Sequence, residues 1–126
     1  MVAAGPAASD GEASGRLSIP ERMRADLARA MKARDRVAVS VLRATLAAFA
    51  NAEAPPAPEA VTWPPSAVGR LVEHRRIDLS HADHEQIVRA EIADRRAAIA
   101  DYAAGGRHDE AATLERGVAL LAAYLA

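Results

Sequence analysis

The sequence of 126 residues contains no cysteine, which excludes disulfide bonds, thiolate chemistry and zinc sites built on cysteine. Aromatic residues make up only 3% of the chain, so we expect a small and mostly aliphatic core. No apolar run approaches the roughly 20 residues of a membrane-spanning helix. Residues 1–17 lack the basic start and apolar stretch of a signal peptide, and we expect a disordered tail there. We therefore expect a cytoplasmic protein without a membrane partner.

Alanine is what the sequence has in excess, with 33 of the 126 residues. It has the highest intrinsic helix propensity of all residues. No stretch alternates apolar and polar residues with the period of a β-strand. These features predict an all-α protein: a small bundle made of a helical hairpin, a Pro-rich connector, a long helix and a returning C-terminal helix.

Charge is nearly balanced over the whole chain, at −1, but its distribution is uneven. Residues 16–43 hold eight basic side chains against three acidic ones, a net charge of +5. Five of these basic residues are candidates for contact with RNA phosphates or with a protein partner: Arg29, Lys32, Arg34, Arg36 and Arg43. No aromatic residue lies among them, so a platform for base stacking is not indicated. The alternative is a solvated helix face with local acidic partners.

The first hairpin is predicted within residues 18–52. Ser18 and Glu21 form a capping-box pattern with Pro20 in the first turn, and an apolar stripe follows. The stripe consists of Met23, Leu27, Ala30 and Met31. Asp35 is a good N-cap and a poor core residue, so we expect a break at Arg34–Asp35 and a second helix from Arg36 to about Asn51. One continuous bent helix is the alternative.

A Pro-rich connector is expected at residues 55–65, where five prolines exclude a helix. Ser66 can then cap a short helix from Ala67 to about Ile77. The connector is taken as part of one helical domain that covers residues 18–126.

The second half of the domain contains the longest predicted helix. Ser80 and Asp83 form a second capping box, which opens a helix from about His81 to Ala104. Gly105-Gly106 ends it, and Asp109 is expected to start the last helix. The expected apolar positions of the long helix are Ile87, Val88, Ile92, Ile99 and Tyr102. Those of the last helix are Leu114, Val118, Leu121 and Leu125.

Two further groups of polar residues are candidates for chemistry. Arg43, Glu91 and Arg95 are expected to form a polar cluster with a structural role, because an arginine one helical turn from Glu91 favours its ionised form. His81 and His84 are weak metal candidates, because their i,i+3 spacing lacks a third ligand. We expect no catalytic residue, no metal and no cofactor.

Two runs of residues carry a resemblance to a known family. The first contains Leu27, Ala30 to Asp35, Ser40 to Arg43, and Asn51 to Glu53. The second contains Glu91, Arg95-Arg96, Ile99, Tyr102, Gly106-Arg107, Asp109, Ala112, Glu115, Leu121 and Tyr124-Leu125. In order and spacing they resemble the N-terminal helical half of YqeY-like proteins (GatB/YqeY domain-containing proteins) over about Ile19 to Leu125, with the Pro-rich segment as an insertion.

The resemblance implies an all-helical fold related to the tail region of the GatB subunit of the tRNA-dependent amidotransferase. That enzyme converts misacylated Glu-tRNA(Gln) or Asp-tRNA(Asn), a carbon–nitrogen ligase reaction with glutamine as amide donor. The tail contacts tRNA, while the chemistry takes place in other domains and subunits. Family members typically continue past a Tyr-Leu-Pro step into a second helical domain, whereas this sequence reaches Tyr124-Leu125-Ala126.

These observations favour a non-catalytic helical accessory or interaction module. Its candidate partners are tRNA and the amidotransferase subunits. One alternative is a protein that binds RNA directly through the basic surface of residues 22–43. The other is a dimerisation or protein–protein interaction module that uses the C-terminal helix.

Overall fold

A computed structural model describes residues 17–55 and 76–126 of the chain. These residues form four α-helices and no strand: α2 (Ile19–Ala33), α3 (Arg36–Glu53), α4 (His81–Ala104) and α5 (His108–Ala122). A short 3-10 turn, η2 (Ala123–Leu125), follows α5. The predicted all-α bundle is confirmed.

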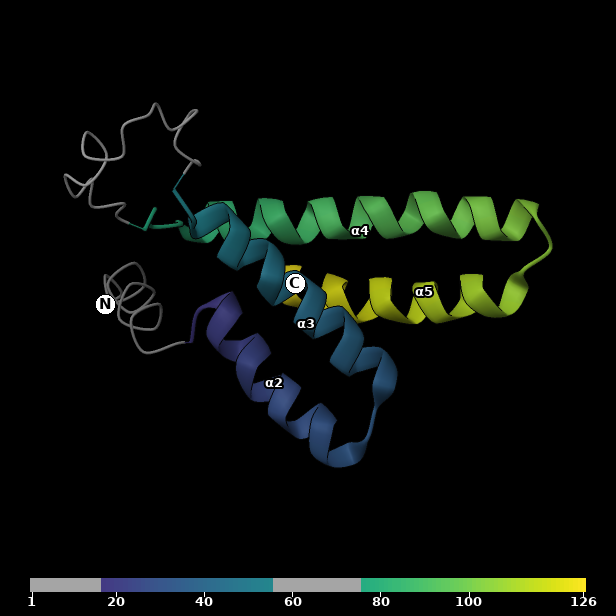
Figure 1. The fold of residues 1–126 in the computed structure, drawn as a ribbon, viewed down its shortest axis with the longest axis horizontal. Coiled ribbons are helices and arrows are strands. Elements are labelled where there is room, and N and C mark those ends of the chain that lie inside the picture. Colours follow the sequence, from purple (N-terminus) through teal and green to yellow (C-terminus); the bar gives the residue numbers. More distant parts are fainter. Residues whose placement is uncertain (1–16, 56–75) are drawn as a thin grey trace, which may run out of the picture.

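The four helices form two antiparallel pairs (Figure 1). The helices α4 and α5 run side by side along the longest axis of the molecule, and α2 and α3 form a V-shaped hairpin. The second arm of this hairpin, α3, contacts α4 and α5 as well as α2. The far ends of α4 and α5 extend beyond the α2–α3 hairpin.

Both predicted capping boxes are present. At the start of α2 the Ser18 hydroxyl accepts a hydrogen bond from the Glu21 amide at 3.2 Å, and the Glu21 carboxylate accepts one from the Ser18 amide at 2.8 Å. Ser80 and Asp83 form the same pair of bonds at the start of α4, at 3.1 and 2.9 Å. Helices α2 and α4 thus begin where side chains satisfy free backbone amides of the first turn.

The predicted break between the first two helices is also confirmed, and the alternative of one continuous helix is wrong. Arg34 ends α2 with a left-handed backbone (φ 57°, ψ 36°). Asp35 then caps α3, its carboxylate accepting a hydrogen bond from the Ala38 amide at 3.1 Å. Arg34 and Asp35 alone therefore connect α2 to α3.

The start of the last helix differs from the prediction. Helix α5 begins at His108 with Arg107 as its N-cap, and Asp109 lies inside the first turn. The turn after α4 closes earlier than expected, because Gly106 adopts a positive φ of 77° and the Arg107 amide donates to the Tyr102 carbonyl at 2.8 Å. Helix α5 can therefore start before Asp109.

Three predictions fall wholly or partly outside the described residues. The disordered tail lies there except for Leu17, and the Pro-rich connector lies there except for Pro55. Of the short helix expected at residues 67–77, only Arg76 and Ile77 are described, and neither is helical. The described residues on the two sides of residues 56–75 are in contact, because the Ile77 amide donates a hydrogen bond to the Glu53 carbonyl at 2.9 Å.

The core lies where all four helices meet. Its largest fully buried side chains are Ile19, Met23, Leu42, Thr45, Val88 and Leu121. The hydroxyl of Thr45 is satisfied within α3, where it donates to the Val41 carbonyl at 2.9 Å. Ile99 and Tyr102 were expected on the same apolar stripe as Val88, but they are only half-buried. Both lie in the last two turns of α4, and the far end of this helix extends beyond the α2–α3 hairpin (Figure 1).

The inward face of α5 is built from smaller residues than expected. Ala111, Gly117 and Leu121 are buried, whereas Leu114, Val118 and Leu125 are half-buried. A Cβ atom added at Gly117 would lie 2.9 Å from the Cγ2 atom of Val41. The absence of a side chain at this position therefore allows α5 to pack closely against α3.

Candidate functional site

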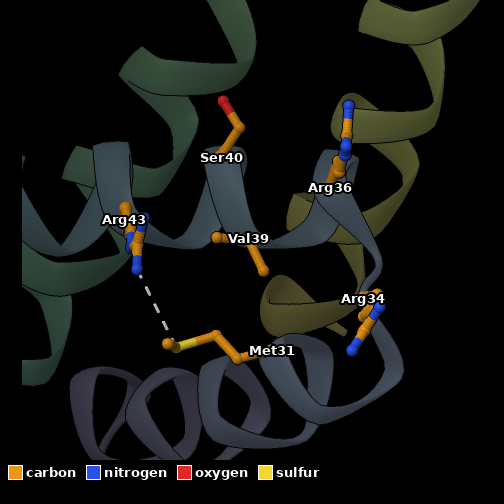
Figure 2. A pocket seen from close by; sticks show the side chains of 6 residues that line it. All are labelled: Met31, Arg34, Arg36, Val39, Ser40 and Arg43. Carbon is orange, nitrogen blue, oxygen red and sulfur yellow. Dashed lines mark hydrogen bonds between the residues drawn. The ribbon is translucent and has the colours of Figure 1, made fainter.

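The strongest candidate site is a pocket at the elbow between α2 and α3, with a volume of about 510 Å3 (Figure 2). We call it the elbow pocket. It is lined by three arginines, two apolar residues and a serine: Arg34, Arg36, Arg43, Met31, Val39 and Ser40. Its volume lies within the range of about 300–1,000 Å3 that is usual for ligand pockets. It brings together three of the five basic residues singled out in the sequence.

One face of α3 supplies most of this pocket. Arg36, Val39, Ser40 and Arg43 follow one another at helical spacings of three, one and three residues, so they lie on one face over two turns. The opposite face of α3 is directed to the core and carries Val41, Leu42, Thr45 and Phe49. Packing of that inner face leaves the Arg36–Arg43 face directed outward.

Arg34 reaches the pocket through an unusual backbone conformation. It is the only residue other than glycine with a positive φ among the described residues, and its place at the end of a helix is one that glycine normally takes. A left-handed backbone costs a residue with a side chain about 1 kcal/mol or more. The fold therefore tolerates a local cost in a position that adds a guanidinium group to the pocket.

No acidic side chain of the described ranges forms an ion pair with Arg34, Arg36 or Arg43. The nearest acid in sequence, Asp35, uses its carboxylate to cap α3. Arg43 lies against the sulfur of Met31, with its Nη2 atom 3.9 Å from Sδ (Figure 2). The positive charge of the pocket is thus not neutralised by an ion pair within this part of the fold, and an anion can approach it.

Met31 was expected in the apolar stripe of the first helix, but its side chain is 50% exposed. The turn at Arg34 places α3 so that Ala30 is buried and Met31 lies in the pocket. Met31, Val39 and Ser40 are therefore candidate site residues that the sequence did not identify. The signal that points to Val39 and Ser40 is their spacing from Arg36 and Arg43 on one helix face.

The two remaining basic candidates do not line the elbow pocket. Arg29 forms an ion pair with Asp26, and Asp26 also accepts a hydrogen bond from the Tyr124 hydroxyl. Lys32 is exposed in the last turn of α2. The five candidate residues thus divide into a group of three at the pocket and two residues outside it.

The expected polar cluster is only partly formed. Arg95 and Glu91 form an ion pair at 2.9 Å, and the Arg95 side chain is 15% exposed. Arg43, expected as the third member, lies at the elbow pocket instead and has no ion pair with Glu91 in the described structure. Arg95 lines a smaller cavity of about 110 Å3 together with Gly117 and Val41, at the junction of α3, α4 and α5.

The two histidines have different surroundings. His81 is exposed and lies 3.4 Å from the carboxylate of Glu85. His84 is buried, and its ring meets that of Phe49 edge-on at a centroid distance of 5.2 Å. Burial lowers the pKa of His84 below its usual value, and the nearby His81 contributes in the same direction. Within residues 17–55 and 76–126, no three His, Asp or Glu side chains gather in a way that would hold a metal ion.

Comparisons with protein-family models, with curated proteins and with solved structures give no match for this chain. In the described part of the chain, no helix is both long enough and apolar enough to cross a membrane.

Proposed function

We propose that the chain is a non-catalytic helical module that binds RNA through the elbow pocket. One observation carries this proposal: Arg34, Arg36 and Arg43 line one pocket, and none of them forms an ion pair with an acid in the described residues. The resemblance to YqeY-like proteins makes tRNA the candidate RNA and the subunits of the tRNA-dependent amidotransferase the candidate protein partners.

The chemistry of the lining supports a ligand with phosphate groups. Guanidinium groups are planar donors that bind phosphate oxygens in a bidentate manner. The excess of positive charge in residues 16–43 attracts a polyanion to this end of the molecule, although the net charge of the chain is −1. The contacts are to the backbone of the nucleic acid, so they supply affinity and orientation rather than sequence specificity.

The non-catalytic part of the proposal is supported by what the pocket offers. Besides the three guanidinium groups it contains one hydroxyl, that of Ser40, and the apolar side chains of Met31 and Val39. A serine needs an adjacent base to act as a nucleophile, and among the described residues no carboxylate or imidazole lines this pocket.

The test is the binding of fluorescently labelled tRNA, measured by anisotropy over a series of salt concentrations. We expect affinity that falls steeply with salt, with a slope of about 0.7–0.9 per phosphate contacted. The triple variant Arg34, Arg36, Arg43→Gln should bind at least about tenfold more weakly and show a slope that is smaller by about 2–3.

The matched control is Arg89, Arg96, Arg116→Gln, which removes the same charge. Arg89 and Arg96 line a different hollow, of about 430 Å3, between α4 and the last residues of the chain. Equal losses in the two triple variants would show that only the total charge matters, and tRNA binding that neither variant weakens would contradict the proposal.

A further inference from the structure

The elbow pocket is charged at both ends and apolar between them. Arg43 lies at one end, Arg34 and Arg36 lie at the other, and Met31 and Val39 lie between the two (Figure 2). Arg36 and Arg43 are seven residues apart on α3, which corresponds to a rise of about 10 Å along the helix. The order of these lining residues thus matches a ligand with an apolar part between two anionic groups.

We propose that the elbow pocket holds an unpaired nucleotide of a single-stranded RNA segment, an inference that rests on the RNA binding proposed above. The base lies on Met31 and Val39. The phosphate on one side of it is bound by Arg43, and the phosphate on the other side by Arg34 and Arg36. In duplex RNA the bases are paired and stacked inside the double helix, so they cannot reach this apolar floor.

The floor can hold a base although the described residues contribute no aromatic side chain to it. Met31 is 50% exposed, and its polarizable sulfur is a good apolar contact for a flat ring. The Arg43 guanidinium is already held beside that sulfur, and guanidinium planes also stack on bases. Contact with the faces of the rings would be tolerant of base identity, so we expect little sequence preference.

An acidic peptide is the competing ligand, and the pocket fits it less well. An amphipathic helix docks through three or four apolar anchors along a groove, whereas the described residues supply only Met31 and Val39 to this floor. An extended peptide needs partners for its own backbone amides, but α2 and α3 use most of their backbone groups within the helices. The backbone of RNA needs no such partners, since its phosphates are satisfied by arginine side chains.

Three forms of one short labelled RNA test the inference with the full chain: the single strand, the duplex with its complement, and a single strand with abasic sites. Electrostatics alone favours the duplex, whose charge density is higher. We expect the reverse, with the single strand bound about fivefold more tightly than the duplex. The abasic strand should bind about three- to tenfold more weakly than the intact strand, because it retains the phosphates and lacks the ring.

The variant Met31→Ala separates base contact from phosphate contact. It should weaken binding of the intact strand by about three- to tenfold and weaken binding of the abasic strand clearly less, since there only the placement of Arg43 beside the Met31 sulfur is lost. Leu17→Ala is the matched control, because Leu17 is exposed to a similar extent, 53%, and does not line the pocket. It should change neither affinity. Circular dichroism on both variants verifies the helical fold.

The outcomes distinguish this inference from the proposed function. RNA binding that depends on Arg34, Arg36 and Arg43 but is equal for single strand, duplex and abasic strand overturns the unpaired nucleotide and leaves RNA binding in place. If no RNA binds in a way that depends on these arginines, both proposals fall. Binding of polyglutamate in preference to every RNA would likewise overturn both, in favour of an acidic protein partner.

Discussion

The Tyr124 hydroxyl donates a hydrogen bond to the carboxylate of Asp26 and thereby joins the turn η2 to helix α2, 98 residues away in sequence. Asp26 also pairs with Arg29, and the Arg22 guanidinium lies 4.9 Å from the centre of the Tyr124 ring. Burial and the Asp26 carboxylate raise the pKa of Tyr124 well above its usual value of 10.0. The tyrosine therefore remains a hydrogen-bond donor at neutral pH.

The first prediction concerns this contact. Tyr124→Phe should lower the free energy of unfolding by about 1 kcal/mol, because the ring still fills its place but the partly buried Asp26 carboxylate loses a donor. Urea denaturation followed by circular dichroism measures the change. Tyr102→Phe is the control, since Tyr102 is half-buried and its hydroxyl has no hydrogen bond in the described structure. A loss as large for Tyr102→Phe would show that the Asp26 contact contributes nothing of its own.

The second prediction concerns the close packing of α5 on α3. Gly117→Ala should destabilise the protein by about 1 kcal/mol or more, although alanine is the better helix former. The added Cβ would lie 2.9 Å from Val41 Cγ2, and a valine in a helix has little freedom to turn away. Thermal unfolding is the measurement.

A double mutant identifies the cause of that destabilisation. In the background of Val41→Ala the clash is absent, so Gly117→Ala should become stabilising by up to about 1 kcal/mol through helix propensity alone. Gly105→Ala is the second control, because the nearest atom to its added Cβ is 3.6 Å away. Destabilisation that persists in the Val41→Ala background would contradict the packing explanation.

The third prediction concerns pH and His84. Because burial lowers the pKa of His84 in the folded state below 6.5, the unfolded chain binds a proton more readily. The charges that face it oppose one another: His81 lowers the pKa, while Glu53 and Asp83 raise it. With the folded pKa depressed, stability is full above about pH 6.5 and falls as the pH drops below that value.

Denaturation of the protein and of His84→Leu at about pH 7.5 and about pH 5.5 tests this expectation, since most carboxylates titrate below that range. The protein should lose stability on acidification, and the variant should lose less. His81→Gln should retain most of the effect, because His81 is exposed. A variant His84→Leu with undiminished pH dependence would assign the effect to another group.

The fourth prediction concerns Arg34. Replacement by glycine relieves the left-handed backbone, so the free energy of unfolding of Arg34→Gly should stay equal or rise by up to about 1 kcal/mol. The same variant should bind tRNA more weakly, because the elbow pocket loses a guanidinium group. Stability and affinity would thus change in opposite directions. Simultaneous loss of both would indicate that Arg34 supports the fold rather than the ligand.

The helix boundaries were largely predictable because they depend on local interactions. Ser18, Asp35 and Ser80 cap helices through bonds to residues three positions away, and such bonds are visible in the spacing of the sequence. Asp109 was assigned wrongly because the turn before it closes through the positive φ of Gly106, a conformation that the sequence permits but does not require.

The elbow pocket was predictable only in part, because it depends on how the helices cross. The spacing of Arg36 and Arg43 places them on one helix face, but Met31 continues the apolar pattern of α2, which predicts a core residue. Whether it is buried depends on the direction of α3, which the backbone of Arg34 sets. Arg43 was expected near Glu91 for the same reason: helical spacing does not tell which neighbouring helix a side chain meets.

The hydrogen bond between the Ile77 amide and the Glu53 carbonyl has a consequence for how this chain can vary. Glu53 ends α3, and it contacts Arg76 and Ile77, which precede α4. Residues 54–76 therefore begin and end at the same place in the fold. Related sequences could lengthen, shorten or replace that stretch while the helices keep their mutual arrangement. The stretch that begins and ends at the Glu53–Ile77 contact is also a suitable insertion site for a fluorescent protein or an affinity tag, because this contact lies away from the elbow pocket along α3.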